Sequence, residues 1–170
     1  MYFYNMKLRI AFVNDIPKIM EVAEATWKQT YASIISQEQI DFMYEKAYTY
    51  DAILEQMHAG HTFLIYFENN IPLGFISYYI RDDNMLFIPK LYVKPTTQGK
   101  GVGKILLQET EKIALKNKLN FLELNVNRKN PAMYFYKKNG FELFEKADIA
   151  IGKYWMNDYI LRKKIEGDEN

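Results

Sequence analysis

Hydrophobic positions at the start of the chain first alternate and then recur at helical spacing. Residues 6–13 alternate with a period of two, which predicts a first strand. Asn14 and Asp15 are residue types that cap helix N-termini, and the apolar positions after them recur every three to four residues as far as Tyr31. Two further short helical patterns lie within 37–58. This part of the chain is therefore predicted to be one strand followed by helices that each bury one face.

From residue 62 onward the pattern has a period of two, which predicts strands. Short polar turns separate the first three, so we expect an antiparallel meander over 62–68, 73–81 and 85–93. A Gly-rich loop, a helix, a strand, a helix and two strands follow, over 98–103, 104–117, 121–126, 131–139, 141–145 and 154–161. Because a strand–helix–strand crossover joins parallel strands, the sheet should be mixed. We predict an α/β (α+β) protein with a single domain over 1–170, about seven strands and about four to five helices.

Composition excludes several kinds of site. The 170 residues are 49% hydrophobic and 25% charged, which is enough apolar surface for a core. The net charge of +1 gives no global electrostatic reason to expect nucleic acid or a membrane surface as a partner. The absence of cysteine excludes disulfides and thiolate sites, and two histidines make a His-rich metal site unexpected. Since no apolar run reaches the roughly 18 residues of a membrane-spanning helix, we expect a cytoplasmic protein without metal.

The loop from Gln98 to Gly103 lies between a predicted strand and a predicted helix, where a phosphate could bind. The first N–H groups of a helix lack intrahelical acceptors, and glycines let the backbone approach an anion closely. The Walker A spacing fails because its second glycine would fall on Lys104, and the dinucleotide fingerprint fails at Lys104 or Leu106. The pattern that does fit is Gln-x-x-Gly-x-Gly, with Gly101 in the middle. Taken alone, the loop could also be only a tight turn.

This pattern resembles the pyrophosphate-binding loop of the GNAT-type N-acetyltransferases. The segment 91–95 before it is similar to the family's strand and turn, and 130–141 is similar to its Asn…Ala-x-x-x-Tyr-x-x-x-Gly-Phe helix. Residues 15–17, Asp-Ile-Pro, match a common opening of the family's first helix. The resemblance spans nearly the whole chain. It implies a sheet in which the parallel strands 85–93 and 121–126 splay apart around acetyl-CoA.

The resemblance also implies which residues carry the chemistry. Those expected to bind acetyl-CoA, through backbone or side chain, are Leu91, Tyr92, Val93, Gln98, Gly99, Lys100, Gly101, Val102, Gly103, Lys104, Asn130 and Tyr136. A backbone N–H near Tyr92 or Val93 would stabilise the oxyanion, and Tyr136 would protonate the leaving thiolate. The alternative for Tyr136 is a core aromatic position, and for the two lysines a solvated surface.

The chain departs from the family pattern in two places. Asn125 stands where some members have Glu, and residues 88–90 are Ile-Pro-Lys where others carry Glu. With no evident general base, a water oriented by Asn125 or an amine that enters uncharged would have to suffice. Asn130 lies six residues before Tyr136, where many members have seven.

Aromatic residues are the candidates for the acceptor site, because their faces suit cations and apolar groups alike. They are Trp27, Tyr31, Tyr78 and Tyr79, with core packing as the alternative reading, above all for Trp27. The segment 152–161 is similar to the last strand of bacterial members that include polyamine acetyltransferases, so we expect a small-molecule amine as acceptor. Trp155 and Tyr159 in this segment are equally candidates for a homodimer interface.

The resemblance leaves several functions open. The expected reaction is direct attack of a primary amine on acetyl-CoA in a ternary complex, with a polyamine as the candidate acceptor. The alternatives are acetylation of a protein or peptide N-terminus, transfer of a longer acyl chain, and a non-catalytic acyl-CoA sensor.

Overall fold

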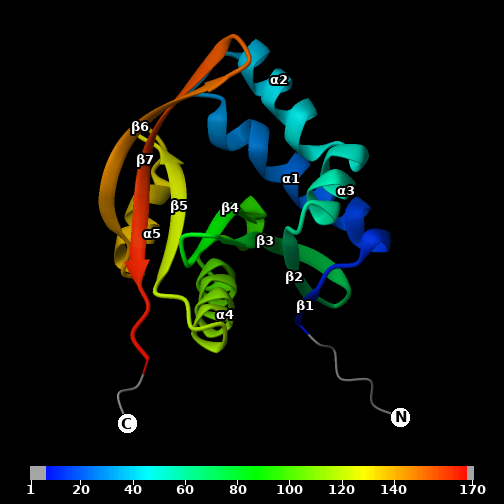
Figure 1. Ribbon diagram of the computed structural model, residues 1–170. Coiled ribbons are helices and arrows are strands. Elements are labelled where there is room, and N and C mark those ends of the chain that lie inside the picture. Colours follow the sequence, from blue (N-terminus) through cyan, green and yellow to red (C-terminus); the bar gives the residue numbers. More distant parts are fainter. Residues whose placement is uncertain (1–6, 168–170) are drawn as a thin grey trace. The chain divides into compact units, whose positions relative to one another are not determined.

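The computed structural model describes residues 7–167, which form two compact units (Figure 1). Unit 1 is Met1–Ser77 together with Lys90–Leu107, and unit 2 is Tyr78–Pro89 together with Gln108–Asn170. Each unit is described by itself below. The single domain expected from the sequence stays a prediction.

The described residues form five α-helices and seven strands. The helices are α1 (Ile16–Tyr31), α2 (Gln37–Tyr48), α3 (Tyr50–His58), α4 (Val102–Lys116) and α5 (Ala132–Lys138), with 3-10 turns at Val13–Asp15 and Pro95–Thr97. The strands are β1 (Leu8–Ile10), β2 (Thr62–Glu68), β3 (Ile71–Arg81), β4 (Met85–Val93), β5 (Phe121–Asn127), β6 (Glu142–Ile151) and β7 (Tyr154–Lys164). The predicted order of helices and strands is confirmed, although β1 is shorter than expected.

The strands hydrogen-bond in the order β1-β2-β3-β4-β5-β7-β6. The pair β4–β5 is parallel, in register from Met85 opposite Phe121 to Ile88 opposite Leu124, as the crossover argument requires. β5 pairs antiparallel with β7, and β7 with β6. The predicted mixed α/β sheet is thus confirmed, with one parallel pair.

The last hairpin is longer than the sequence pattern indicated. β6 runs to Ile151, six residues beyond the expected end at 145, and β7 runs to Lys164. The reason is that β6 is an edge strand whose side chains are mostly exposed, and the adjacent Leu143 and Phe144 interrupt the hydrophobic alternation that would reveal its length. Figure 1 shows β6 and β7 running side by side, in orange and red.

In unit 1, an acidic residue ties β1 to the start of α1. Asp15 is the N-cap residue of α1, as expected, but its side chain makes no capping hydrogen bond there. Instead its two oxygens accept from the Arg9 guanidinium at 2.7 and 2.9 Å, and one of them also accepts from the Phe12 N–H at 2.9 Å. The Arg9 pair, with the Phe12 and Lys18 hydrogen bonds, holds the pKa of Asp15 well below its usual range.

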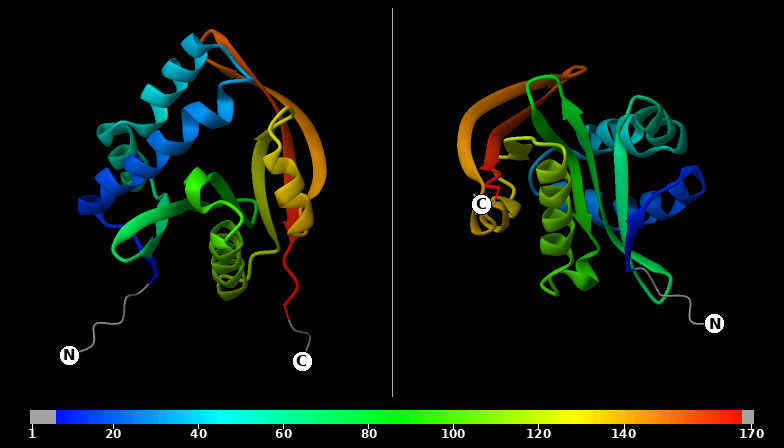
Figure 2. Two further views of the ribbon diagram at one scale, coloured as in Figure 1. Left: turned by 180° about the vertical axis from the view of Figure 1, so that it is seen from behind. Right: turned by 60° about the horizontal axis from the view of Figure 1, so that its bottom comes forward.

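In unit 2, α5 covers one face of β5 and β7. It lies behind these strands in Figure 1 and in front of them in the reversed view of Figure 2. On β5, the buried Glu123 accepts hydrogen bonds from Arg81 and Arg162, each at 2.6 Å. This carboxylate is therefore satisfied by a cation on each side.

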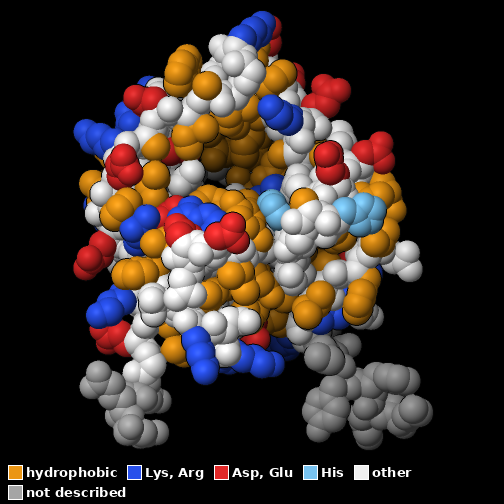
Figure 3. All heavy atoms as spheres, viewed as in Figure 1, with side chains coloured by type: hydrophobic (Ala, Val, Ile, Leu, Met, Phe, Trp, Pro, Cys, Tyr) orange, Lys and Arg blue, Asp and Glu red, His pale blue; other side chains and the backbone are white. Residues whose placement is uncertain are grey.

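The surface carries both signs of charge. Figure 3 shows basic and acidic side chains interspersed on the visible face, in keeping with the net charge of +1. Within residues 7–167, no helix is long and apolar enough to cross a membrane.

Candidate functional site

The Gly-rich loop of unit 1 has a backbone that only glycine adopts easily. Gly99 and Gly101 have φ angles of +84° and +83°, in the left-handed region. α4 begins at Val102, and its first intrahelical bond here runs from the Ile105 N–H to the Gly101 carbonyl at 3.0 Å. The N–H groups of Val102, Gly103 and Lys104, in the first turn of the helix, therefore lack intrahelical acceptors and lie at the positive end of its dipole. This arrangement fits a pyrophosphate.

Gln98 ties this loop to the strand before it. Its Nε2 donates to the Val93 carbonyl at 3.2 Å, and Val93 is the last residue of β4. The exposed side chain thus braces the loop, a role that the motif alone does not reveal. Lys100 and Lys104 are exposed, which agrees with the surface reading and leaves them accessible to an anion.

Gly74 on β3 is a residue of this region that the sequence reading missed. A Cβ added there would lie 3.0 Å from the Tyr92 carbonyl oxygen and 3.2 Å from side-chain carbons of Val93 and Val102. Glycine thus lets β3 approach the end of β4 and the start of α4. A glycine inside a strand is the signal that could have found it.

Two of the expected acceptor residues lie in a buried aromatic cluster of unit 1. The ring of Trp27 lies 4.3 Å from that of Tyr31, 5.4 Å from Tyr48 and 6.1 Å from Tyr92. Trp27 is 5% exposed, and its Nε1 donates to the Ile40 carbonyl at 3.2 Å. The structure brings Trp27 and Tyr31 together with Tyr92 in a packed core, and their contact with an acceptor stays a prediction.

Lys90 of β4 adds a buried cation to this cluster. Its Nζ donates to Oε1 of Gln56 at 2.8 Å and lies 5.5 Å from the centre of the Tyr48 ring. Among the described residues no carboxylate pairs with it, and burial lowers the pKa of Lys90 to about 8. The sequence indicated only that Lys90 stands where some family members carry Glu, and it did not predict a buried cation there.

In unit 2, the candidate acid Tyr136 is a packed residue of α5. It is 8% exposed, and its ring lies edge-on to Phe141 at 5.7 Å and to Phe135 at 5.4 Å. Its ring therefore fits the core reading. Its catalytic role stays a prediction.

The two asparagines of the expected site also lie in unit 2. The Asn130 side-chain oxygen accepts from the Ala132 N–H at 2.9 Å and so shapes the start of α5. Asn125 is exposed on β5, opposite Ile160 of β7. Tyr78 and Tyr79 belong to unit 2 as well, and their role with an acceptor stays a prediction, as does a homodimer through the exposed Trp155.

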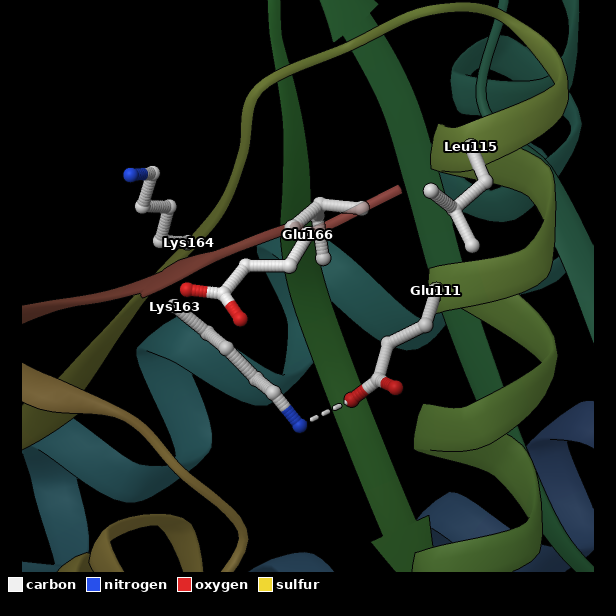
Figure 4. Close-up of a pocket in the computed structure, with 6 residues that line it drawn as sticks. Glu111, Leu115, Lys163, Lys164 and Glu166 are labelled. Carbon is white, nitrogen blue, oxygen red and sulfur yellow. Dashed lines mark hydrogen bonds and ion pairs between the residues drawn. The ribbon is translucent and has the colours of Figure 1, made fainter. Parts of the chain in front are cut away.

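A cavity of about 250 Å³ in unit 2 involves none of these residues. Its lining consists of Glu111, Leu115, Lys163, Lys164, Ile165 and Glu166. Figure 4 shows Lys163 pointing at Glu111, with which it forms an ion pair, while Lys164 points away. Residues 7–167 contain no group of three His, Asp or Glu side chains placed to hold a metal ion.

Comparison with known proteins places the chain in a family. The model of the acetyltransferase (GNAT) family matches residues 20–141. The spermidine N(1)-acetyltransferase of Thermoplasma acidophilum is 33% identical over 168 residues, covering 95% of this chain and 99% of that protein.

Solved structures agree with this assignment. The crystal structure of PaiA N-acetyltransferase from Thermoplasma acidophilum in complex with coenzyme A matches with a TM-score of 0.78 at 33% identity, over 94% of this chain and 99% of that one. A GCN5-related N-acetyltransferase from Rhodopseudomonas palustris matches with a TM-score of 0.80 at 22% identity, over 96% and 98%, and shares the fold. The chain therefore belongs to the GNAT family and is an acyltransferase that uses acetyl-CoA as its co-substrate.

Proposed function

We propose that this chain transfers the acetyl group of acetyl-CoA to a primary amine of a small polyamine. The observation that carries the proposal is the 33% identity, over 95% of the chain, to a protein named a spermidine N(1)-acetyltransferase. The loop geometry supports the cofactor half of the proposal, because left-handed glycines before a helix N-terminus suit a pyrophosphate.

The residues of unit 1 would hold the cofactor. In this proposal the N–H groups of the loop from Gly99 to Gly103 bind the pyrophosphate, apart from that of Lys100, which donates to the Thr97 carbonyl at 3.4 Å. The side chains of Lys100 and Lys104 add positive charge beside it. Gln98 keeps the loop fixed to Val93 through its hydrogen bond. The backbone of 91–93 at the end of β4 would bind the pantetheine arm. Such positioning contributes much of the acceleration of a two-substrate reaction, about 7–11 kcal/mol in oriented systems.

The transfer itself would be a single displacement through a tetrahedral intermediate. The uncharged amine nitrogen attacks the thioester carbon, the C–N bond forms, the C–S bond breaks, and coenzyme A leaves as a thiolate. The thiolate then takes a proton, for which Tyr136 is the proposed donor. The attacking nitrogen loses a proton to solvent, and Asn125 is the proposed residue to orient that water.

An acetylation panel tests the proposal. The protein is incubated with acetyl-CoA and one amine at a time: spermidine, propylamine, lysine, an aminoglycoside or a peptide with a free N-terminus. The products are identified by mass spectrometry. We expect spermidine to be acetylated with the highest kcat/KM. A preference for the peptide would contradict the acceptor. Tight binding of acetyl-CoA without any product would favour the sensor alternative.

A further inference from the structure

One face of the β5–β7 pair in unit 2 carries several polar side chains, among them two asparagines and an aspartate near one end of the pair. Asn127 is directly opposite Asp158, and Asn125 is directly opposite Ile160. Directly opposed residues of antiparallel strands share a face, and so do residues two apart in one strand. Asn125, Asn127 and Asp158 therefore lie on the same face, and Asn127 and Asp158 are both buried.

One oxygen of the Asp158 carboxylate is buried without a hydrogen-bond partner among the described residues. The residue is 7% exposed, and its Oδ1 atom is buried and accepts no hydrogen bond from the described residues. Nε of Arg128 donates to the Asp158 backbone carbonyl at 3.2 Å, and its Nη2 donates to the Asp148 side chain at 2.9 Å. Leaving a buried carboxylate oxygen unpaired is costly, so its presence calls for an explanation.

Glu123 on the same face shows what a structural carboxylate looks like here. Glu123 is 4% exposed, and each of its oxygens accepts from an arginine at 2.6 Å, one from Arg81 and one from Arg162. Both carboxylates are thus buried, but both oxygens of Glu123 have a partner whereas Oδ1 of Asp158 has none among the described residues. A fold-stabilising role accounts for Glu123 and does not account for Asp158.

The neighbours of Asp158 do not compete for its free oxygen. Asn127 uses its oxygen to accept from the Lys129 N–H at 3.0 Å, and its amide nitrogen lies 4.0 Å from the Met156 sulfur. On β6 the residue opposite Asp158 is Ala147, which carries no polar group. Burial raises the pKa of Asp158, and the charge of Arg128 opposes this shift. Oδ1 of Asp158 therefore lacks an N–H donor among the described residues, and a ligand with N–H groups and positive charge would supply one.

We propose that Asp158 binds a charged, non-reacting ammonium group of the acceptor and so selects polyamines over monoamines. This inference rests on the proposed function, which makes the acceptor a polyamine. Near neutral pH a polyamine keeps its other nitrogens protonated when one nitrogen loses its proton to attack. An ammonium N–H would supply the charge-assisted hydrogen bond that Oδ1 of Asp158 lacks.

The test compares a polyamine and a monoamine in matched variants. For Asp158→Asn, which keeps the side-chain shape, we expect the ratio of kcat/KM for spermidine to kcat/KM for propylamine to fall about ten- to a hundredfold. The loss should lie in the KM for spermidine. Glu123→Gln is the control, since it removes an equally buried carboxylate from the same face, and its ratio should equal that of the wild type.

Several outcomes would overturn the inference. An unchanged ratio in Asp158→Asn would do so, and so would an equal fall in kcat for both amines, which would instead make Asp158 a proton acceptor in the reaction. A wild type that binds spermidine but does not acetylate it would refute the proposed function alone. If Asp158→Asn fails to fold, the wild type alone can test the inference. The rise in its Tm on adding spermidine should become larger as pH increases and Asp158 ionises. A rise in Tm that does not change with pH would refute the inference.

Discussion

Gly74 and the Tyr92 carbonyl lie so close together that a Cβ on Gly74 would stand 3.0 Å from the oxygen. Because Tyr92 is near the end of β4, the absence of a side chain on β3 fixes where the expected pantetheine-binding backbone lies. The contact is backbone against backbone, so a flexible side chain cannot relieve it.

Gly74→Ala should therefore weaken acetyl-CoA binding by displacing β4. Overpacking of this kind costs about 1–3 kcal/mol of stability, and we expect the Kd for acetyl-CoA, measured by calorimetry, to rise as well. Gly167→Ala is the control, because among the described residues a Cβ there meets the Leu115 side chain alone, at 3.9 Å. Equal affinities in both variants would show that β4 does not bind the cofactor.

Gly101→Ala should impair acetyl-CoA binding through backbone conformation alone. At φ +83° an alanine is strained by about 1–2 kcal/mol, although nothing lies within 4 Å of the added Cβ. Gly60→Ala is a matched control, since Gly60 has φ +101° and equally open surroundings outside the loop. The Tm of both variants should fall by a similar amount, and only Gly101→Ala should bind acetyl-CoA more weakly. Equal affinity of the two variants for acetyl-CoA would show that this loop does not bind the pyrophosphate.

Tyr136→Phe should lower kcat at least tenfold while acetyl-CoA still binds, because general acids contribute about 10²–10⁴-fold to such reactions. The ring contacts with Phe135 and Phe141 survive the substitution, so the Tm should stay within a few degrees of the wild-type value. Rapid-quench measurement of a single turnover reads out the chemical step directly. Wild-type turnover in the variant would show that Tyr136 is a core residue and does not act as the acid.

Asp15→Asn should destabilise the protein most at neutral pH. The Arg9 pair lowers the pKa of Asp15 in the folded state, so the stabilisation is complete above the unfolded pKa of about 4 and is lost as pH falls below it. Urea unfolding measured across pH 3–7 should show a free energy of unfolding that decreases less at acid pH in the variant than in the wild type. Parallel curves for the two proteins would mean that the Arg9 pair contributes nothing.

Asp158→Asn should stabilise the free enzyme at neutral pH. Burial raises the pKa of Asp158 to about 6, so the folded state binds more protons than the unfolded state between about 4 and 6, and stability falls as pH rises through that window. Removing the charge should recover on the order of 1–3 kcal/mol at pH 7. Differential scanning calorimetry at pH 4 and pH 7 checks this, and a gain confined to pH 4 would contradict it.

Much of the fold follows from local pattern. Hydrophobic periodicity located the helices and all the inner strands, and the glycine spacing located the loop whose φ angles the structure shows to be left-handed. These features depend on residues close in sequence. In the exposed strand β6 this pattern is interrupted at Leu143 and Phe144, which is why the predicted length of the strand was wrong.

The long-range partners could not be predicted in this way. Glu123 meets Arg81 from 42 residues away and Arg162 from 39 residues away, and nothing in the local sequence couples them. Nothing in the local sequence distinguishes Asp158, and its place in the register of β7 against β5 and β6 decides that one of its carboxylate oxygens is buried without a partner among the described residues. Pairing between distant strands decides both cases.

The most direct test of the account is the initial-rate pattern with spermidine and acetyl-CoA varied together. Direct transfer in a ternary complex predicts intersecting double-reciprocal lines and one molecule of acetylspermidine for each coenzyme A released. Parallel lines, or release of coenzyme A without acetylated spermidine, would contradict it.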